Sequence, residues 1–155
     1  MLRAVLAVLL AAAILTVSHP IIQQGRQEHA ATLLAEEVDD LVAEAKDLVA
    51  TDEATGGPGA RRIVTLDLPT SGRFSAGANA ITIDGGPPPR VEWAVEDGRT
   101  ERRILEDVRL RTPDDDPLVV RGSGQERLLL ALDGRPGEPV VEISHFQSGA
   151  SDADA

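Results

Sequence analysis

Hydrophobic and polar positions divide the chain into a helical first third and a β-rich remainder. Between residues 4 and 24, no Asp, Glu, Lys or Arg interrupts a run of mostly apolar residues. Beyond this run, apolar residues recur at alternating steps of three and four, at Ala31, Leu34, Val38, Leu41, Ala45 and Leu48. This spacing is typical of an amphipathic helix with one buried face. We therefore predict helix from the N-terminus to residue 50, with the apolar face of residues 34–49 packed on the rest of the protein.

The uncharged run reaches about the twenty residues that a helix needs to cross a bilayer, so residues 1–22 are predicted to be a transmembrane or leader helix. The single preceding cation, Arg3, and the acidic excess after Arg26 favour an N-terminus inside the cell and the bulk of the chain outside. Three interpretations stay open: a secretory signal cut after Ala13 or Ser18, a signal anchor, and a short basic leader removed from a retained helix.

A proline lies near the end of the uncharged run. Inside a helix, Pro20 removes one backbone hydrogen bond and kinks the axis. Ser18 is also suited to cap a fresh helix whose early turn contains Pro20. We therefore expect a kink or a restart of the helix at this point, and we interpret His19 as an interfacial polar residue, not as a ligand.

Residues 23–50 form the predicted amphipathic helix, and its many acidic side chains lie outside the apolar stripe. Glu37 with Asp40, and Asp40 with Glu44, are spaced to chelate a hard cation weakly. Such cation sites usually need loop oxygens as well. We therefore interpret these carboxylates as a solvated helix surface.

The helix is predicted to end in a linker at residues 51–60, where two glycines and a proline follow each other. The hydrophobic period then changes from 3.6 to 2, which indicates strands. Alternating or apolar runs lie at residues 62–68, 78–83, 91–95, 100–105, 108–111, 118–120, 126–132 and 140–146. The Asp97-Gly98 pair is the strongest hairpin signal, and Trp93 before it is expected to be buried.

These runs predict six to eight short strands in a β-rich head at residues 61–147. Their spacing of about ten residues is typical of a mostly antiparallel sheet or a small sandwich. Residues 148–155 are small and polar and are expected to be a disordered tail. The predicted fold class is α+β: a long N-terminal helix whose amphipathic part packs on an antiparallel sheet or small sandwich.

Composition narrows the function classes. The chain has 26 acidic and 15 basic residues, a formal charge of -11, no cysteine and only three aromatic residues, two Phe and one Trp. The charge and the scarcity of stacking side chains disfavour nucleic-acid binding. Without cysteine, neither disulfides nor thiolate metal sites can form. An acidic surface with Lys46 as its one lysine is typical of proteins exposed to high salt, although a GC-rich genome favours the same residues.

A search for catalytic chemistry finds no candidate. The three histidines fall in three separate predicted elements, His19 in the first segment, His29 in the amphipathic helix and His145 in the last strand. Asp114 to Asp116 lack the spaced ligands of a Ca²⁺ loop, so we interpret them as a solvated acidic turn. Gly122-Ser123-Gly124 does not match the nucleophile elbow. We predict no catalytic, cofactor-binding or metal-binding residue and no enzymatic activity.

The chain resembles a type IV pilin or pseudopilin in architecture: a short basic leader (Met1 to Ala4), an apolar helix, its amphipathic continuation and a β-rich head. Its composition resembles that of halophilic archaea, whose surfaces carry type IV pilus-like machinery. In this family a prepilin peptidase cuts after a small residue that follows a basic one, which implies a cut near Ala4. The family's glutamate shortly after the cut is absent between Val5 and Val17. The resemblance therefore implies a minor or atypical subunit.

Family membership would imply that the N-terminal helices of several subunits bundle together while the heads face solvent. The expected partners are the membrane, other pilin-like subunits and assembly proteins, in an archaeal pilus-like surface or secretion system. The expected location is a single-pass membrane position with the head outside the cytoplasm, at the cell surface. The alternative is a signal-anchored or secreted cell-surface binding module of a halophile, which uses the head to hold a partner.

Overall fold

The computed structural model describes residues 2–52, 59–72, 75–135 and 137–147. Most of the predicted linker at residues 51–60 and the predicted tail at residues 148–155 lie outside these ranges. Within α1, the side chains of residues 2–5 and 9–21 also lie outside the description.

One long helix begins the chain. Helix α1 (Leu2–Thr51) comprises 50 residues, which corresponds to roughly 75 Å at 1.5 Å per residue. The predicted restart of the helix between Ser18 and Pro20 is wrong, because α1 continues through both residues. A proline removes only one of the backbone hydrogen bonds in its turn, so the many remaining bonds of a long helix keep it continuous.

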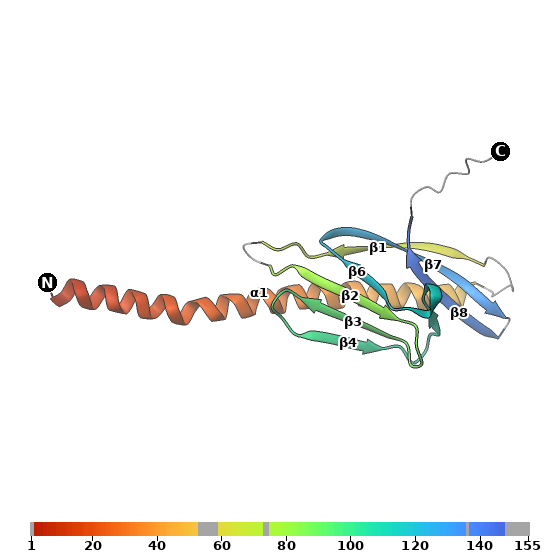
Figure 1. Cartoon of the computed structure of the whole chain (residues 1–155), viewed down its shortest axis with the longest axis horizontal. Coiled ribbons are helices and arrows are strands. Elements are labelled where there is room, and N and C mark those ends of the chain that lie inside the picture. Colours follow the sequence, from red (N-terminus) through yellow and green to blue (C-terminus); the bar gives the residue numbers. More distant parts are fainter. Residues whose placement is uncertain (1, 53–58, 73–74, 136, 148–155) are drawn as a thin grey trace.

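In the described residues after α1, eight strands form two four-stranded sheets (Figure 1). The first sheet has the order β1 (Arg61–Leu68), β7 (Gly124–Arg135), β8 (Glu138–His145) and β5 (Leu110–Arg111). The second sheet has the order β4 (Thr100–Ile104), β3 (Arg90–Val95), β2 (Ala78–Asp84) and β6 (Leu118–Arg121). All neighbouring strands are antiparallel except β5 and β8, and the short 3-10 helix η1 (Pro113–Asp115) follows β5.

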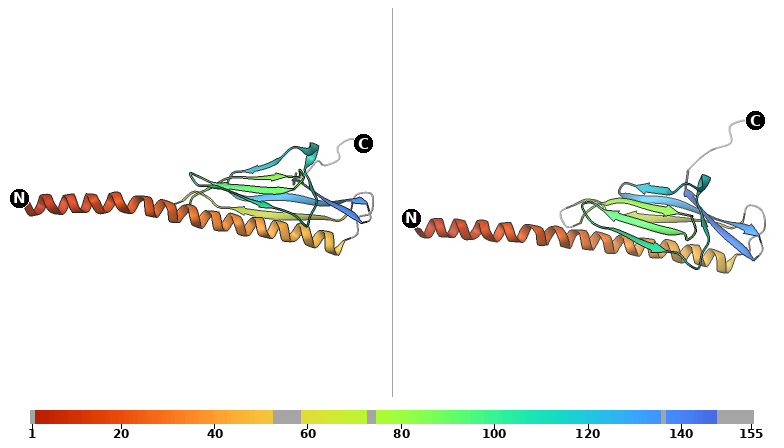
Figure 2. Two further views of the ribbon diagram at one scale, coloured as in Figure 1. Left: turned by 90° about the horizontal axis from the view of Figure 1, so that it is seen from below. Right: turned by 60° about the horizontal axis from the view of Figure 1, so that its bottom comes forward.

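Helix α1 closes the space between the two sheets. It contacts β1, β7 and β8 of the first sheet and β3 of the second. In both views of Figure 2, α1 runs along the strands beneath the head and then continues well beyond it. The predicted α+β class and the mostly antiparallel head are therefore confirmed.

A single hydrophobic core joins the helix and both sheets. Each sheet supplies its inward-facing residues at alternate positions, as the period of two requires. From α1 the buried residues are Ala30, Leu34, Val38, Leu41, Ala45 and Leu48. The stripe differs from the predicted one at a single position, because Ala30 is buried and Ala31 is only partly so. Trp93 is 4% exposed, which confirms that it belongs to the core.

Candidate functional site

Helix α1 has two parts with different surroundings. The docked segment, residues 26–51, carries the buried stripe and all the described hydrogen bonds from α1 to the head. The projecting segment, residues 2–25, extends past the head (Figures 1 and 2). Its large apolar side chains with described exposure are open to solvent: Leu6 is 69%, Val8 68% and Ile22 61% exposed. In the described parts of the chain, the most exposed large apolar side chains therefore lie on the projecting segment.

Ion pairs hold the docked segment along both of its flanks. Arg62 of β1 donates to Glu44 Oε2 at 2.6 Å and to Asp47 Oδ2 at 2.8 Å. The hydrogen bond from Arg62 holds the pKa of the Asp47 carboxyl below its ordinary value. On the other flank, Asp39 pairs with Arg103 of β4. The helix carboxylates therefore help to hold α1 on the head.

The docking pairs give the first prediction. Arg62→Ala should lower the melting temperature of the protein at 0.1 M salt, and the loss should shrink at 1 M salt. The reason is that the Debye length falls from about 10 Å to about 3 Å between these two concentrations. The measurement is thermal unfolding followed by circular dichroism, and Arg61→Ala, the exposed neighbour on β1, is the matched control. An equal loss at both salt concentrations would show that the arginine stem acts through packing and not through charge.

A clamp of polar contacts surrounds α1 where it leaves the head. The Arg26 guanidinium donates to the carbonyl oxygens of Gly72 at 2.5 Å and Ser75 at 3.1 Å. The Ala76 N–H donates to the Arg26 carbonyl at 3.4 Å. One residue on, the Gln27 amide donates to the carbonyl of Asp97 in the β3–β4 turn at 2.8 Å. Hydrogen bonds with two loops of the head therefore hold α1 and fix the direction in which the projecting segment extends from the head.

The carboxylate of Glu96 connects these two loops by hydrogen bonds. The Ser71 hydroxyl donates to Glu96 Oε2 at 2.5 Å, and the Gly77 N–H donates to the same oxygen at 3.2 Å. The Ser71 bond first, and the Gly77 bond second, lower the pKa of Glu96 from its ordinary value of 4.5. These two donors therefore stabilise the ionised carboxylate in the folded protein.

This lowered pKa gives the second prediction. A carboxyl whose pKa is lower in the folded state adds stability above its unfolded pKa, and this stability disappears as the pH falls through the folded pKa. Wild type should therefore melt higher than Glu96→Gln at pH 7, and the gap should close as the pH falls below 4.5. Melting curves of both proteins from pH 7 to pH 3 test this, with Glu106→Gln as a control for charge removal. A gap that stayed constant over this range would contradict the assignment.

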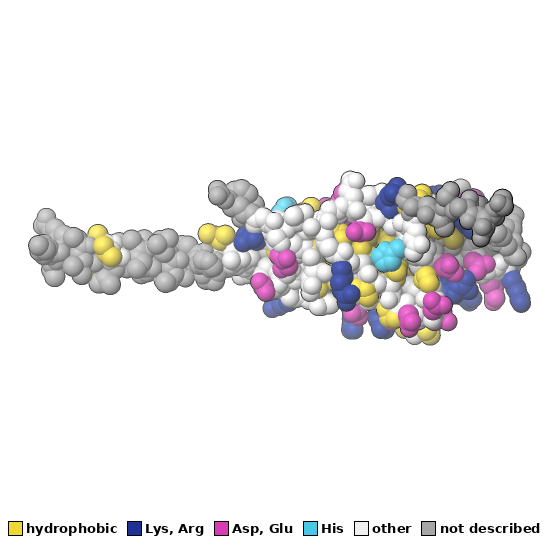
Figure 3. All heavy atoms as spheres, turned by 45° about the horizontal axis from the view of Figure 1, so that its top comes forward, with side chains coloured by type: hydrophobic (Ala, Val, Ile, Leu, Met, Phe, Trp, Pro, Cys, Tyr) yellow, Lys and Arg dark blue, Asp and Glu magenta, His cyan; other side chains and the backbone are white. Residues whose placement is uncertain are grey.

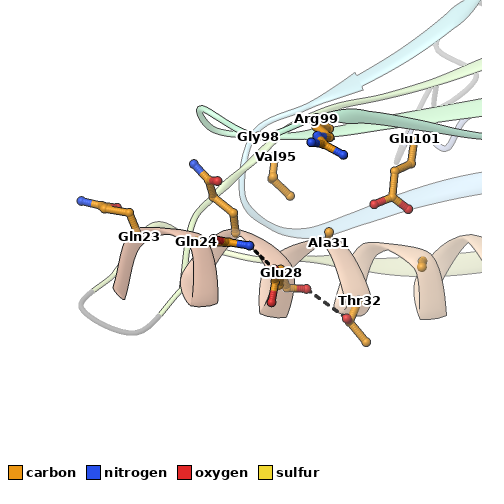
Figure 4. A pocket seen from close by; sticks show the side chains of 11 residues that line it. Gln23, Gln24, Glu28, Ala31, Thr32, Val95, Gly98, Arg99 and Glu101 are labelled. Carbon is orange, nitrogen blue, oxygen red and sulfur yellow. Dashed lines mark hydrogen bonds between the residues drawn. The ribbon is translucent and has the colours of Figure 1, made fainter. Parts of the chain in front are cut away.

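A hollow of about 830 Å³ lies beside the clamp, between α1 and the β3–β4 hairpin (Figure 4). The helix lines it with the amides of Gln23, Gln24 and Gln27, and the hairpin adds Arg99 and Glu101. Among the described residues that line the hollow there is no histidine, cysteine or serine. Its amide-rich wall, to which Glu28 and Thr32 also contribute, suits polar contacts.

Two of the three carboxylates considered as cation ligands have other partners. Glu37 Oε2 accepts the N–H of Asp67, at 3.0 Å, and Glu44 pairs with Arg62. Asp40 lines a separate cleft of about 480 Å³ beside β1. In the described parts of the chain, no group of three or more His, Asp or Glu side chains is arranged to hold a metal ion. The paired helix carboxylates thus have structural roles.

The remaining candidates of the sequence lie on different elements of the fold. His29 is exposed on α1 and His145 is exposed at the end of β8, while the side chain of His19 lies outside the description. Asp114 and Asp115, both with φ of 58°, form an exposed turn after β5. Gly122 to Gly124 carry the chain from β6 in one sheet to β7 in the other. The structure does not bring these residues together into one site.

On one face of the head, the charged side chains do not gather into a patch of one sign (Figure 3). On the face shown in Figure 3, acidic and basic side chains are interspersed, with small apolar areas between them. Arg111, for example, donates to Asp133 at 2.6 Å and to Glu142 at 2.7 Å on the outer side of the first sheet. Among the described side chains, the most exposed large apolar ones, Leu6, Val8 and Ile22, all lie on the projecting segment, whereas Ile63 and Ile104 of the head are about half exposed.

The clamp residues were not predicted from the sequence. Arg26 and Gln27 are ordinary polar residues of a helix, and their partners are backbone carbonyls of loops 46 to 70 residues away. A carbonyl acceptor leaves no trace in the sequence, because every residue type supplies one. The only feature of the sequence that pointed to the clamp was the position of Arg26, which is the first cation after the uncharged run.

Among the residues whose side chains the structure describes, no helix is both long enough and apolar enough to span a membrane. The side chains of residues 9–21, which make up most of the predicted membrane segment, are outside that set.

Comparison with known proteins gives one result. No curated protein and no solved structure matches the chain. A family model described as a domain of unknown function (DUF7311) matches residues 1–146, which include α1 and all eight strands. The chain therefore belongs to the DUF7311 family.

Proposed function

We propose that the protein is a non-enzymatic, pilin-like subunit that assembles through the projecting segment of α1. In this proposal the segment lies in the membrane or among neighbouring subunits, and the head lies outside the cytoplasm at the cell surface. The system is an archaeal type IV pilus-like surface or secretion apparatus. Because Val5 to Val17 contain no acidic residue, the protein is proposed as a minor or atypical subunit.

The observation that supports this proposal is the continuity of α1 across its two parts. A single helix carries both the stripe buried in the head and the segment that extends past it. The 24 residues of the projecting segment correspond to roughly 36 Å of helix, against about 30 Å for the hydrocarbon core of a bilayer. A helix of this length is not needed to complete so small a head, so its projecting part is available for lipid or for other subunits.

The composition of the projecting segment also supports assembly. Of the ten residues from Ala4 to Ala13, five are alanine and the other five are valine or leucine. Small side chains let helix backbones approach closely in lipid, where contact depends on packing. Leu6 and Val8 are both about two-thirds exposed and are thus open to a partner.

Site-specific capture tests the proposal directly. Because the chain contains no cysteine, Val8→Cys provides a unique site for a benzophenone maleimide. After illumination of native membranes, we expect an adduct between residue 8 and a second copy or another pilin-like subunit. Ala43→Cys, exposed on the docked segment, is the matched control and should give far less adduct. Capture of lipid alone at residue 8 would instead indicate an anchored surface module, and recovery in the soluble fraction would indicate a secreted one.

A further inference from the structure

Each sheet of the head has one edge that lies beside α1. The first sheet ends at β1 and the second at β4, and in the part of the chain that the structure describes no further strand pairs with either. Arg62 of β1 pairs with Glu44 on one flank of α1, and Arg103 of β4 pairs with Asp39 on the other. The two edges therefore lie on opposite sides of the helix.

Along β1, every second residue directs its backbone groups away from β7. The Leu132 N–H donates to the Ala60 carbonyl, at 2.8 Å, just before the strand begins. Since bonding alternates along an antiparallel ladder, the even-numbered residues of β1 bond to β7 and the odd-numbered ones do not. The Asp67 N–H, for example, donates to a carboxylate of α1 instead. The N–H and C=O groups of Ile63 and Thr65 therefore point to the open edge.

The same alternation on β4 directs the backbone groups of Arg102 and Ile104 to the other open edge. The Leu105 N–H donates to the Pro89 carbonyl, at 2.9 Å, so the odd-numbered residues of β4 bond to β3 and the even-numbered ones do not. A row of backbone donors and acceptors on an open edge is a template for another strand. The chain presents two such rows beside α1.

The two edges also carry the exposed large apolar side chains of the described part of the head. Ile63 on β1 is 48% exposed, and Ile104 on β4 is 49% exposed. Both residues belong to the set whose backbone groups point to an open edge. Charged side chains usually protect such edges from pairing, whereas an exposed isoleucine favours it. A pairing that sets Ile63 of one copy opposite Ile104 of another covers both side chains.

This register also brings opposite charges together. Arg61 lies opposite Glu106, and Asp67 is a diagonal neighbour of Arg102, and all four are exposed. Opposite charges at directly opposed or diagonal positions stabilise a pair of strands. They offset part of the repulsion between two copies that each carry a formal charge of -11. In an antiparallel ladder the opposed pairs are Ile63–Ile104, Arg61–Glu106, Thr65–Arg102 and Asp67–Thr100.

The directions of the two strands suit copies whose helices are parallel. Arg62 pairs with Glu44, and further along β1 the Asp67 N–H bonds to Glu37, so β1 runs opposite to α1. The contacts of α1 before and after β4 advance along both elements together, so β4 runs in the same direction as α1 (Figure 1). Copies with parallel helices therefore present β1 and β4 to each other in antiparallel orientation.

We propose that β1 of one copy pairs with β4 of the next, so that neighbouring heads share a continuous sheet. A cleft of about 480 Å³, lined by residues 62–65 and by α1, provides room beside the middle of β1. The contact joins two different edges, so each head binds one neighbour on each side, and repetition gives a ring or a filament. This inference rests on the proposed function, because it specifies how the heads of subunits with parallel helices contact each other.

Cross-linking of opposed positions tests the contact. Because the chain contains no cysteine, Ile63→Cys and Ile104→Cys together provide one thiol on each edge. The Cβ atoms of directly opposed residues lie about 5 Å apart in a ladder, within reach of a short bismaleimide. In native membranes, we expect the double variant to give covalent dimers and larger oligomers. Each single variant should stay monomeric, because the contact does not bring two copies of the same residue together.

A charge exchange in this double variant tests the register. Arg61→Glu should reduce cross-linking about fivefold, since it places two carboxylates opposite each other. Adding Glu106→Arg should restore cross-linking, because the opposite charges are then exchanged between the edges. The melting temperatures of the purified proteins serve as the control and should agree, since both positions are exposed. Failure of Glu106→Arg to restore cross-linking would show that this register is wrong.

Comparison with capture at residue 8 distinguishes failure of this inference from failure of the proposed function. Capture of a subunit at residue 8, together with cross-linking of the double variant, supports both. Capture at residue 8 without cross-linking would overturn the contact between β1 and β4 and leave assembly through α1 intact. Absence of both would overturn both. Covalent dimers of either single variant would also overturn the proposal, because they require two identical edges to meet.

Discussion

Leu41→Asp is expected to unfold the head. Leu41 is 1% exposed and lies in the middle of the stripe with which α1 closes both sheets. Removing a buried leucine side chain from a core costs about 2–5 kcal/mol. The new carboxylate is then either buried without a partner, at a further cost of several kcal/mol, or pulls the helix out of the core. Together these costs approach the 5–15 kcal/mol by which a domain is typically stable.

Circular dichroism with thermal unfolding measures this effect. Leu41→Asp should show no cooperative transition, whereas wild type should show one. Ala43→Asp is the matched control, because it places the same charge on the same helix at an exposed position. A melting temperature of Leu41→Asp close to that of wild type would show that the docked segment is not part of the core.

The second large effect concerns the other end of the helix. In the proposed function, Ala13→Arg removes the protein from the membrane or from its assembly and leaves the head folded. Position 13 lies in the middle of the uncharged run, where an arginine costs about 2.5–3.5 kcal/mol in a membrane helix, or roughly a hundredfold in partition. It precedes the clamp at Arg26 by 13 residues, so the head contacts should not change.

Fractionation of cells and thermal unfolding of the purified protein measure the two parts of this prediction. We expect Ala13→Arg to shift to the soluble fraction with an unchanged melting temperature. Ala50→Arg, exposed at the end of the docked segment, should remain with the membrane. Unchanged fractionation of Ala13→Arg would contradict a role for the projecting segment in lipid or in assembly.

Periodicity was sufficient to predict most of the head and its contact with the helix. The alternation of Val64, Leu66 and Leu68, for example, reappears as the buried side of β1. The change of period after the glycines at residues 56–59 separated helix from strands, because side chains repeat every 3.6 residues in one and every two in the other. The apolar stripe of α1 was likewise confirmed, with Ala30 in place of Ala31.

Other features depend on partners that lie far away in the sequence. Pairing of β1 with β7, more than 50 residues apart, sets the order of the first sheet, and no local pattern specifies it. The parallel contact of β5 with β8 involves only two residues, too few for a periodic signal. A restart of α1 between Ser18 and Pro20, one of the two expectations for this point, does not occur, because the helical turns on both sides outweigh the local preference of the proline. The clamp at Arg26 was not predicted either, because its acceptors are backbone carbonyls of loops far away in the sequence.

One continuous helix thus contributes to the core of the head and also extends past it. Leu34, Leu41 and Leu48 hold the head, and the clamp at Arg26 marks where this role ends. Beyond the clamp, the apolar side chains of Val8 and Ile22 are uncovered. In the proposed function, they are covered by lipid and by other subunits.

The most direct test of this account is the N-terminal sequence of the mature protein isolated from cells. A retained projecting segment requires that the mature chain begin no later than about Val5, and a pilin-like protein should begin at or close to that residue. A start after Ala13 or Ser18 would contradict the account, because the segment proposed to mediate assembly would have been removed.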